Sequence, residues 1–403
     1  MRVLLYTSQF PTPNDPNGGV FTAQLADAMA ARADVEVVCP LPWCPDVGWT
    51  RRHPAWRLFV NVPRALLRGS IPVHYPRFPL VPKVSGAAQP YLQALAAYPL
   101  VARLHRARPI DVIHGHWVYP DGVAATMIAR RLGVPVVLTA LGSDINVYGE
   151  LKLRRRQIGW ALARARAVTG VSRALVDKVI GLGAPAARAH YVPNGIDGAR
   201  FRVPTPVERL EARARLGLDP DRRYLLFLGR LHAVKGLPVL LRALASLAAA
   251  GHLGFDTLLV GDGAERPALE AESSRLGLKS RVRFAGERPH REVPQWLCAA
   301  DALCLPSLME GMPNVVLEAA ATGLPVVASA VGAVPDIVSP ETGILVPPGD
   351  AEALARSLHE VFDRSWRREE VARASPALSW DAVAERYLAI LSANEKPELN
   401  RAA

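Results

Sequence analysis

Two cations and two carboxylates in the second half of the chain have the types and spacing to bind a nucleotide. Arg230 and Lys235 lie in the glycine-bounded segment 229–236, which follows an apolar run and precedes a helical pattern. Two cations five positions apart at a helix entrance suit a diphosphate, because both side chains bind phosphate oxygens. Two solvated surface cations are the alternative interpretation.

The carboxylates Glu310 and Glu318 flank the start of a helix expected over residues 313–321. Backbone N–H groups at a helix start are free to bind phosphate. A carboxylate accepts hydrogen bonds from ribose hydroxyls, so Glu318 is interpreted as a ribose-binding residue rather than a phosphate ligand. The turn between the two carboxylates consists of Gly311, Met312, Pro313 and Asn314.

The first half offers fewer chemical groups. Gly18 and Gly19 follow the first expected strand, where glycines let a polar ligand approach the backbone, although most such loops are only turns. His116 is expected just past the end of a parallel strand, as a catalytic or a structural histidine. Asp144 is expected past the next strand end, where it would hold a substrate hydroxyl or cap a helix.

Alternating strand and helix patterns predict the elements that position these residues. The expected strands cover residues 2–7, 35–38, 111–114, 134–139, 167–171, 191–192, 224–229, 257–261, 282–286, 302–306, 325–328 and 343–346. Helical patterns between them, including one over 237–249 and one after Ser172, predict two consecutive open parallel α/β units. Ligands of such sheets bind beyond the carboxyl ends of the strands, so the expected site is a cleft between the units.

Turn-rich residues around 193–206 mark the expected junction. The predicted domains are 1–198 and 199–375, followed by an amphipathic helix within 376–393. The four cysteines show neither a CxxC pair nor clustered histidines, which argues against a disulfide scaffold or a zinc site. The apolar start of the chain is short and lacks a small-residue cleavage site, which favours a cytoplasmic protein.

Charge is distributed unequally along the chain. The formal net charge is +11; residues 1–200 carry 24 Lys and Arg against 11 Asp and Glu, whereas residues 201–403 carry 24 against 26. The basic half suits a phosphate-bearing substrate, an anionic membrane or nucleic acid. Segment 49–78, rich in Arg, Pro and aromatic residues, suits a membrane interface or is a solvated excursion with a few buried aromatics.

These motifs together resemble the retaining glycosyltransferases of family 4, also called group 1. The resemblance rests on Gly229-Arg230-Leu231…Lys235-Gly236, Val260-Gly261-Asp262-Gly263, Pro193-Asn194-Gly195-Ile196-Asp197 and the Glu-x7-Glu of Glu310 and Glu318, with Gly18-Gly19 and His116 in the amino half. It spans nearly the whole chain, and the amino half is similar to enzymes of bacterial surface polysaccharides such as teichuronic acid. The implied fold is GT-B, with two Rossmann-like domains facing across a cleft and a C-terminal helix that crosses back to the amino domain.

The resemblance also implies roles for the matched residues. Arg230 and Lys235 would bind the donor diphosphate, Glu318 the ribose, and Glu310 the donor sugar, assisted by the amides near Gly311 to Asn314. Gly18 and Gly19 would approach the diphosphate, and His116 would contact the sugar near its reacting carbon. Asp144 and Asn194 are candidate substrate contacts. Many relatives carry an aromatic residue where this chain has Met312, a departure that bears on sugar choice.

The implied reaction moves a hexosyl unit from a nucleotide sugar to a lipid-linked or glycan acceptor, with retention. It needs no metal or other cofactor, since no Asp-x-Asp pair accompanies the cations. The enzyme would work in the cytoplasm at the inner face of the cell membrane, in contact with anionic lipid. The alternatives are a sugar-nucleotide epimerase on the same fold and a basic nucleic-acid-binding protein; no nucleic-acid-binding motif supports the second.

Overall fold

The structure is a computed structural model that describes residues 1–53, 56–80 and 86–393. The chain divides into two compact units. Unit 1 consists of Met1–Gly195 and the segment that begins at Trp380, and unit 2 is Ile196–Ser379. The chain enters unit 2 within β11 (Gly195–Ile196) and leaves it after β18 (Leu378–Ser379), close to the expected junctions at 198–199 and 375–376.

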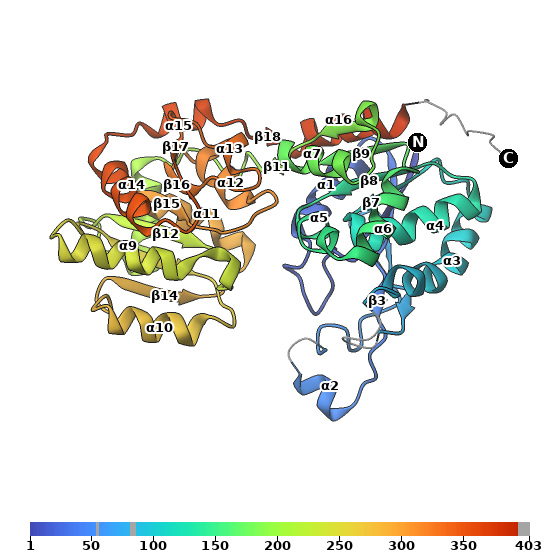
Figure 1. Ribbon diagram of the computed structural model, residues 1–403, viewed down its shortest axis with the longest axis horizontal. Helices are drawn as coiled ribbons and strands as arrows, with labels where there is room; N and C mark the ends of the chain where they lie inside the picture. The colour runs from blue at the N-terminus through green and yellow to red at the C-terminus, as the bar shows by residue number, and fades with distance from the viewer. Residues whose placement is uncertain (54–55, 81–85, 394–403) are drawn as a thin grey trace. The chain divides into compact units, whose positions relative to one another are not determined.

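Unit 1 is built on an eight-stranded sheet of order β10-β9-β8-β7-β1-β2-β5-β4 (Figure 1). Its strands are β1 (Arg2–Tyr6), β2 (Asp34–Val38), β4 (Ala65–Arg68), β5 (Ile71–His74), β7 (Val112–His116), β8 (Val136–Ala140), β9 (Ala167–Gly170) and β10 (Ala189–Tyr191). The strands β3 (Leu41–Pro42) and β6 (Arg77–Phe78) form a separate parallel pair. The β4–β5 pair is antiparallel, whereas β1 runs parallel to both β2 and β7.

The helices of unit 1 are α1 (Val20–Ala30), α2 (Gly48–Arg52), α3 (Gln89–Ala107), α4 (Val123–Leu132), α5 (Ser143–Asn146), α6 (Lys152–Leu162), α7 (Arg173–Gly181) and α16 (Trp380–Ser392). Ser172 caps α7 as predicted, because its hydroxyl accepts a 3.1 Å hydrogen bond from the Leu175 backbone N–H. All five residues of β1 are buried, which is typical of a central parallel strand covered on both faces.

The last helix, α16, belongs to unit 1. Arg32, which follows the end of α1, forms ion pairs with Asp381 at 2.9 Å and Glu385 at 3.1 Å. On its buried side the ring of Tyr387 lies 5.2 Å from that of His114, centroid to centroid. Helix α16 therefore completes the packing of a unit whose other elements all precede Ile196.

Segment 49–78 contributes to the core of unit 1. It contains most of α2 together with β4, β5 and β6, while residues 54 and 55 lie outside the described residues. Tyr75 and Phe78 are each 1% exposed, and the Tyr75 hydroxyl donates a 2.9 Å hydrogen bond to the carbonyl of Pro11. Tyr75 and Phe78 are thus buried aromatic residues of the kind that the second interpretation expected, and β4 and β5 of the segment belong to the eight-stranded sheet.

Unit 2 is a six-stranded sheet of order β14-β13-β12-β15-β16-β17, in which every neighbouring pair is parallel. The strands are β12 (Tyr224–Leu228), β13 (Asp256–Val260), β14 (Val282–Gly286), β15 (Ala302–Leu305), β16 (Val326–Ser329) and β17 (Gly343–Val346). Its helices are α8 (Pro206–Leu216), α9 (Leu237–Ala249), α10 (Arg266–Arg275), α11 (Val293–Ala299), α12 (Asn314–Ala321), α13 (Val334–Ile337), α14 (Ala351–Asp363) and α15 (Arg368–Ala374). The strand order, counted along the chain, is the doubly wound Rossmann order.

Candidate active site

The order of strands in unit 2 reverses between its two central strands. After β12 the chain continues toward β13 and β14 on one side, and it returns with β15 on the other. A parallel sheet opens a crevice at such a reversal, beyond the carboxyl ends of the strands. The segment with Arg230 and Lys235 follows β12, and the one with Glu310 follows β15, so both lie at this point.

The two loops are held against each other. The backbone N–H of Leu308 donates a 2.7 Å hydrogen bond to the carbonyl of Val234. Gly236 has a φ of 66°, and a Cβ atom there would lie 2.0 Å from the carbonyl oxygen of Pro306. Only glycine allows both the left-handed backbone and this close approach, which fixes the position of the neighbouring Lys235.

Lys235, Glu310 and Ser307 form one polar cluster. The ammonium group of Lys235 donates a 2.6 Å hydrogen bond to Oε1 of Glu310, and the Ser307 hydroxyl donates another of 2.6 Å to the same atom. The side chains of Lys235 and Glu310 are 21% and 9% exposed, so the ion pair is largely shielded from solvent. Sequence reasoning did not identify Ser307.

Arg230 is arranged differently from Lys235. Its side chain is exposed, and within the described part of the chain it makes no hydrogen bond or ion pair. The expected pair of cations thus consists of one residue held by a carboxylate and one free to turn toward a ligand.

Glu318 lies on α12 and is 3% exposed. Its Oε1 lies 2.9 Å from Nε2 of His290, in the turn before α11. Burial of a carboxylate without a partner would be costly, and His290 provides that partner. Nothing in the sequence around His290 marked it as part of the site.

The turn between the two glutamates is also buried. Met312 is 8% exposed and Asn314, the first residue of α12, is 9% exposed. The carbonyl of Gly311 accepts a 2.9 Å hydrogen bond from the backbone N–H of Ala333, and Pro313 is the N-cap of α12. The turn is therefore fixed by backbone contacts.

In unit 1 the strand order reverses between β1 and β7. His116 is the last residue of β7 rather than lying past its end, because its backbone continues the ladder opposite Thr139. The side chain is 4% exposed, and Nδ1 lies 3.3 Å from the hydroxyl of Thr22 on α1. Burial lowers the pKa of His116 to about 3, so its imidazole is neutral near pH 7.

The loop after β1 turns at Gly18 and Gly19. Gly19 has a φ of 64°, and a Cβ atom there would lie 2.3 Å from the Gln9 carbonyl. The Gly18 N–H donates a 2.9 Å hydrogen bond to Oδ1 of Asp15. Gly19 thus lets the start of α1 lie directly against the chain that leaves β1.

Asp144 acts within its own loop. Its carboxylate accepts hydrogen bonds from the backbone N–H groups of Val118 at 2.8 Å, Leu141 at 3.1 Å and Gly142 at 2.7 Å. The residue is fully buried, and burial raises its pKa to about 6. Of the two interpretations, a structural cap and a substrate contact, the geometry favours the cap. Asn194 is half-buried in the turn that leads to β11.

A second buried carboxylate, Asp121, escaped sequence reasoning. It accepts hydrogen bonds from the Ser8 N–H at 2.5 Å, the Ser8 hydroxyl at 2.8 Å and the Gln93 amide at 3.1 Å. Burial raises its pKa to about 7. Asp121 joins the loop after β1 to α3 and to the turn after β7, and so stabilises the reversal point of this sheet.

The predicted residues thus fall into separate groups. The structure brings Lys235 together with Glu310, and it pairs Glu318 with the unpredicted His290. His116, Gly18, Gly19 and Asp144 all lie in unit 1, near the reversal point of that sheet. Over residues 1–53, 56–80 and 86–393, no group of three or more His, Cys, Asp or Glu side chains is arranged to hold a metal ion.

Two Rossmann-like units with polar clusters at their strand-order reversals are typical of the GT-B class of glycosyltransferases. Residues 222–364 match the family model described as "Glycosyl transferases group 1", and residues 18–195 match that of the "Glycosyl transferase 4-like domain". A relative named as the teichuronic acid biosynthesis glycosyltransferase TuaC, from Bacillus subtilis (strain 168), is 32% identical over 377 residues, covering 92% of this chain and 91% of the relative. The chain therefore belongs to the group 1 glycosyltransferases and is a transferase, as the sequence motifs predicted.

Solved structures agree on the fold. Sucrose-phosphate synthase from Thermosynechococcus elongatus superposes with a TM-score of 0.76 at 22% identity, covering 96% of this chain and 97% of that one. Anabaena Alr3699/HepE in complex with UDP superposes with a TM-score of 0.73 at 23% identity, covering 97% and 100%. The predicted GT-B fold is confirmed.

No helix in the described ranges is both long and apolar enough to cross a bilayer.

Proposed function

We propose that this protein transfers a hexosyl unit from a nucleoside diphosphate sugar to a lipid-linked or polysaccharide acceptor, with retention and without a metal ion, in bacterial surface polysaccharide synthesis. The observation that carries the proposal is the set of Arg230, Lys235, Glu310 and Glu318 at the strand-order reversal of unit 2. Cleavage of a sugar–diphosphate bond places negative charge on the leaving group. Fixed cations at that point lower the barrier.

Lys235 supplies the first cation. An ammonium group has three N–H donors, so Lys235 can hold Glu310 and still donate to a diphosphate oxygen. Glu310 and Ser307 together fix where the ammonium group lies. Arg230, whose side chain is exposed, adds a guanidinium that binds phosphate through two parallel hydrogen bonds.

Glu318 supplies the ribose contact. Each oxygen of the Glu318 carboxylate has two lone pairs, and the imidazole of His290 uses one lone pair of Oε1. The pair of ribose hydroxyls would donate to the remaining lone pairs. The buried position keeps water from competing for the carboxylate.

Retention follows from attack on the same face as the leaving group. The bond from the anomeric carbon to the diphosphate oxygen breaks, the acceptor oxygen bonds to that carbon, and the acceptor proton passes to the released diphosphate. His116, kept neutral by burial, would hydrogen-bond to the sugar without adding charge to it.

The acceptor class is supported by the relatives and by charge. The name of the relative TuaC refers to teichuronic acid biosynthesis, and the first 200 residues carry a large excess of Lys and Arg. A basic unit suits a lipid-linked acceptor at the anionic inner face of the cell membrane. The cations Arg230 and Lys235 would take the role that a metal ion has in other transferases.

The test is a thermal-shift panel of UDP-, GDP- and ADP-sugars, beginning with UDP-glucose because HepE was solved with that ligand. A ligand that binds only the folded state raises the melting temperature. We expect one nucleotide class to raise it in the wild type and to fail in Glu318→Ala. Absence of a shift with every nucleotide sugar, or an equal shift in the variant, would contradict the proposed site.

A further inference from the structure

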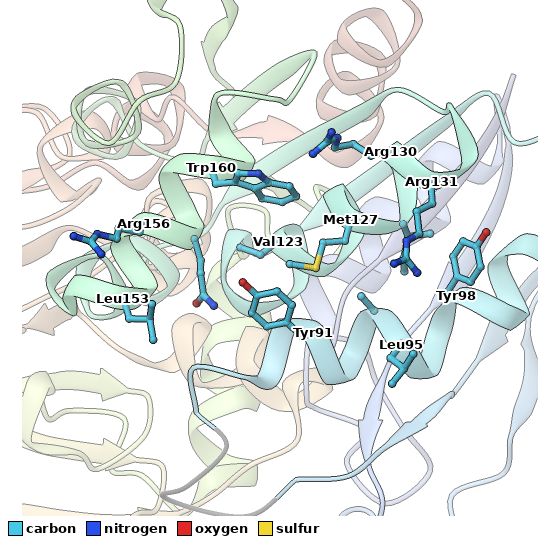
Figure 2. Close-up of a pocket in the computed structure, with 13 residues that line it drawn as sticks. Tyr91, Leu95, Tyr98, Val123, Met127, Arg130, Arg131, Leu153, Arg156 and Trp160 are labelled. Atoms are coloured by element: carbon cyan, nitrogen blue, oxygen red, sulfur yellow. The ribbon is translucent and has the colours of Figure 1, made fainter. Parts of the chain in front are cut away.

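A groove on unit 1 lies apart from the residues discussed so far. It is formed by α3, α4 and α6 and has a volume of about 890 Å³. Figure 2 shows Met127 of α4 between Tyr91 of α3 and Trp160 of α6, with the side chain of Leu95 farther along α3. Its size lies within the range of small-molecule pockets.

The groove exposes apolar side chains to solvent. Leu95 is 71% exposed, Leu153 of α6 is 56% exposed and Tyr91 is 53% exposed. Single exposed apolar residues are normal. Here they gather around one groove, which is typical of a binding surface.

The three helices are also strongly basic. Together they carry eight Lys and Arg and no Asp or Glu. Arg130, Arg131 and Arg156 line the groove. In the part of the chain that the structure describes, none of these three guanidinium groups forms an ion pair with a carboxylate.

Aromatic rings position two of these arginines. The guanidinium of Arg131 lies 5.6 Å from the ring centre of Tyr98, and that of Arg130 lies 5.8 Å from the ring of Trp160. Such cation–π contacts hold a charged group near an apolar surface without neutralising it. Tyr and Trp beside Arg are typical of side chains at the boundary between lipid chains and headgroups.

We propose that this groove binds the anionic phospholipids of a membrane surface, with an acyl chain along the apolar side chains and headgroup phosphates at Arg130 and Arg131 at one end and at Arg156 at the other (Figure 2). The absence of acidic residues from all three helices favours an anion, and the exposed Leu and Tyr side chains favour one that carries a hydrocarbon chain. The inference deepens the proposed contact with the membrane and does not depend on the donor chemistry.

The test is flotation of the full-length protein with vesicles of phosphatidylcholine, alone or mixed with phosphatidylglycerol. We expect binding only to the mixed vesicles, weakened by salt because the charges are exposed. The double variant Arg131→Gln/Arg156→Gln should lower the partition coefficient about 30-fold, since each basic residue near an anionic surface contributes roughly fivefold. Free glycerol phosphate, which lacks acyl chains, should not displace the protein from the mixed vesicles.

Matched controls come from unit 2. Leu210 of α8 is 56% exposed, like Leu153, so Leu153→Ser should weaken binding severalfold while Leu210→Ser should not. The double variant Arg215→Gln/Arg275→Gln removes the same charge as the groove variant, from side chains 66% and 69% exposed. Equal losses in groove and control variants, equal binding to neutral vesicles, or no binding would each overturn the proposal.

The donor site gives an independent readout. The groove variants should keep the wild-type thermal shift with the nucleotide sugar, whereas Glu318→Ala should lose that shift and still bind vesicles. Failure of the groove proposal and failure of the proposed function are therefore distinguishable.

Discussion

Nε2 of His290 lies 2.9 Å from Oε1 of Glu318, which couples the turn before α11 to the second carboxylate of the Glu-x7-Glu motif. The imidazole thereby fixes one rotamer of a nearly fully buried side chain. The affinity for a nucleoside diphosphate should therefore depend on two residues rather than one.

Removing either partner should weaken nucleotide binding. Glu318→Ala deletes the ribose acceptor and should lower the affinity roughly 10- to 100-fold and abolish most transfer, because hydrogen bonds to charged groups contribute about 1.5–3 kcal/mol. His290→Ala should lower affinity less, and His290→Gln, which keeps an N–H donor, should restore part of it. Calorimetric titration measures both effects. Glu360→Ala, at an exposed glutamate of α14, is the control.

Replacing Lys235 and replacing Glu310 should both reduce transfer, but only the Glu310 variant should bind the nucleoside diphosphate more tightly. Lys235→Ala removes the fixed cation and should abolish most transfer while the fold remains intact. Glu310→Gln keeps a hydrogen-bond acceptor but frees the ammonium charge, so nucleoside diphosphate should bind about fivefold more tightly while transfer slows. Steady-state kinetics beside equilibrium binding separates the two effects. Near-normal turnover in Lys235→Ala would exclude its assigned role.

Transfer should persist in excess EDTA. Under the proposed function Arg230 and Lys235 neutralise the leaving diphosphate, so a divalent cation is not required. The rate of acceptor-dependent nucleotide release should be the same before and after chelation. A complete loss that Mg²⁺ reverses would contradict the metal-free mechanism.

Asp121 should give unfolding a distinctive pH dependence. Burial raises its pKa to about 7, whereas an unfolded Asp titrates near about 4. Between these values the folded state holds a proton that the unfolded state has lost, so this group makes the free energy of unfolding fall as pH rises, by at most about 1.4 kcal/mol per pH unit. The contribution is complete below pH ~4 and lost above pH ~7.

The variant Asp121→Asn isolates that contribution. Its amide can still accept from Ser8, and the Oε1 atom of Gln93, buried and unpaired in the described chain, can accept from it after an amide flip. Urea unfolding from pH 4 to 7 should show the variant gaining stability relative to the wild type as pH rises. Asp177→Asn removes an exposed carboxylate from the same unit, and an equal trend there would contradict the assignment to Asp121.

Gly19 should not tolerate alanine. Gly19 and Gly133 have similar φ values of 64° and 68°, but a Cβ at Gly133 meets no atom within 4 Å, whereas one at Gly19 would meet the Gln9 carbonyl at 2.3 Å. Gly133→Ala should cost about 1 kcal/mol for the left-handed backbone. Gly19→Ala should cost about 1–3 kcal/mol more for the overlap. Thermal unfolding compares the stabilities of the two variants. Equal losses of stability would contradict the prediction, because they would show that the loop at Gly19 shifts to make room for the Cβ atom.

Much of the fold was predictable because buried parallel strands are continuous apolar runs. The runs at 224–229 and 282–286 predicted β12 and β14 nearly residue for residue, and the periodic leucines predicted α9. Helix α3 was not predicted, because Pro90 and Pro99 interrupt its pattern. Pro90 stands near the helix start, where the missing N–H is harmless, but nothing local in the sequence shows this.

The site was predictable only where its residues share one motif. Glu310 and Glu318 are eight positions apart and could be found together, whereas His290 reaches Glu318 only through the packing of α11 and α12 against one sheet. Asp144 was found from the sequence, but its role could not be predicted. A carboxylate after a strand fits both a ligand contact and a cap, and only the three backbone N–H groups around it favour the cap.

The return of the chain to unit 1 through α16 has a consequence during synthesis. Unit 2 is a continuous stretch of chain, so its core can form as soon as its last strand has left the ribosome. Unit 1 cannot bury Val383, Ala384 and Tyr387 against its sheet and α1 until the final helix emerges. The half of the enzyme that is translated first is therefore the half that finishes folding last.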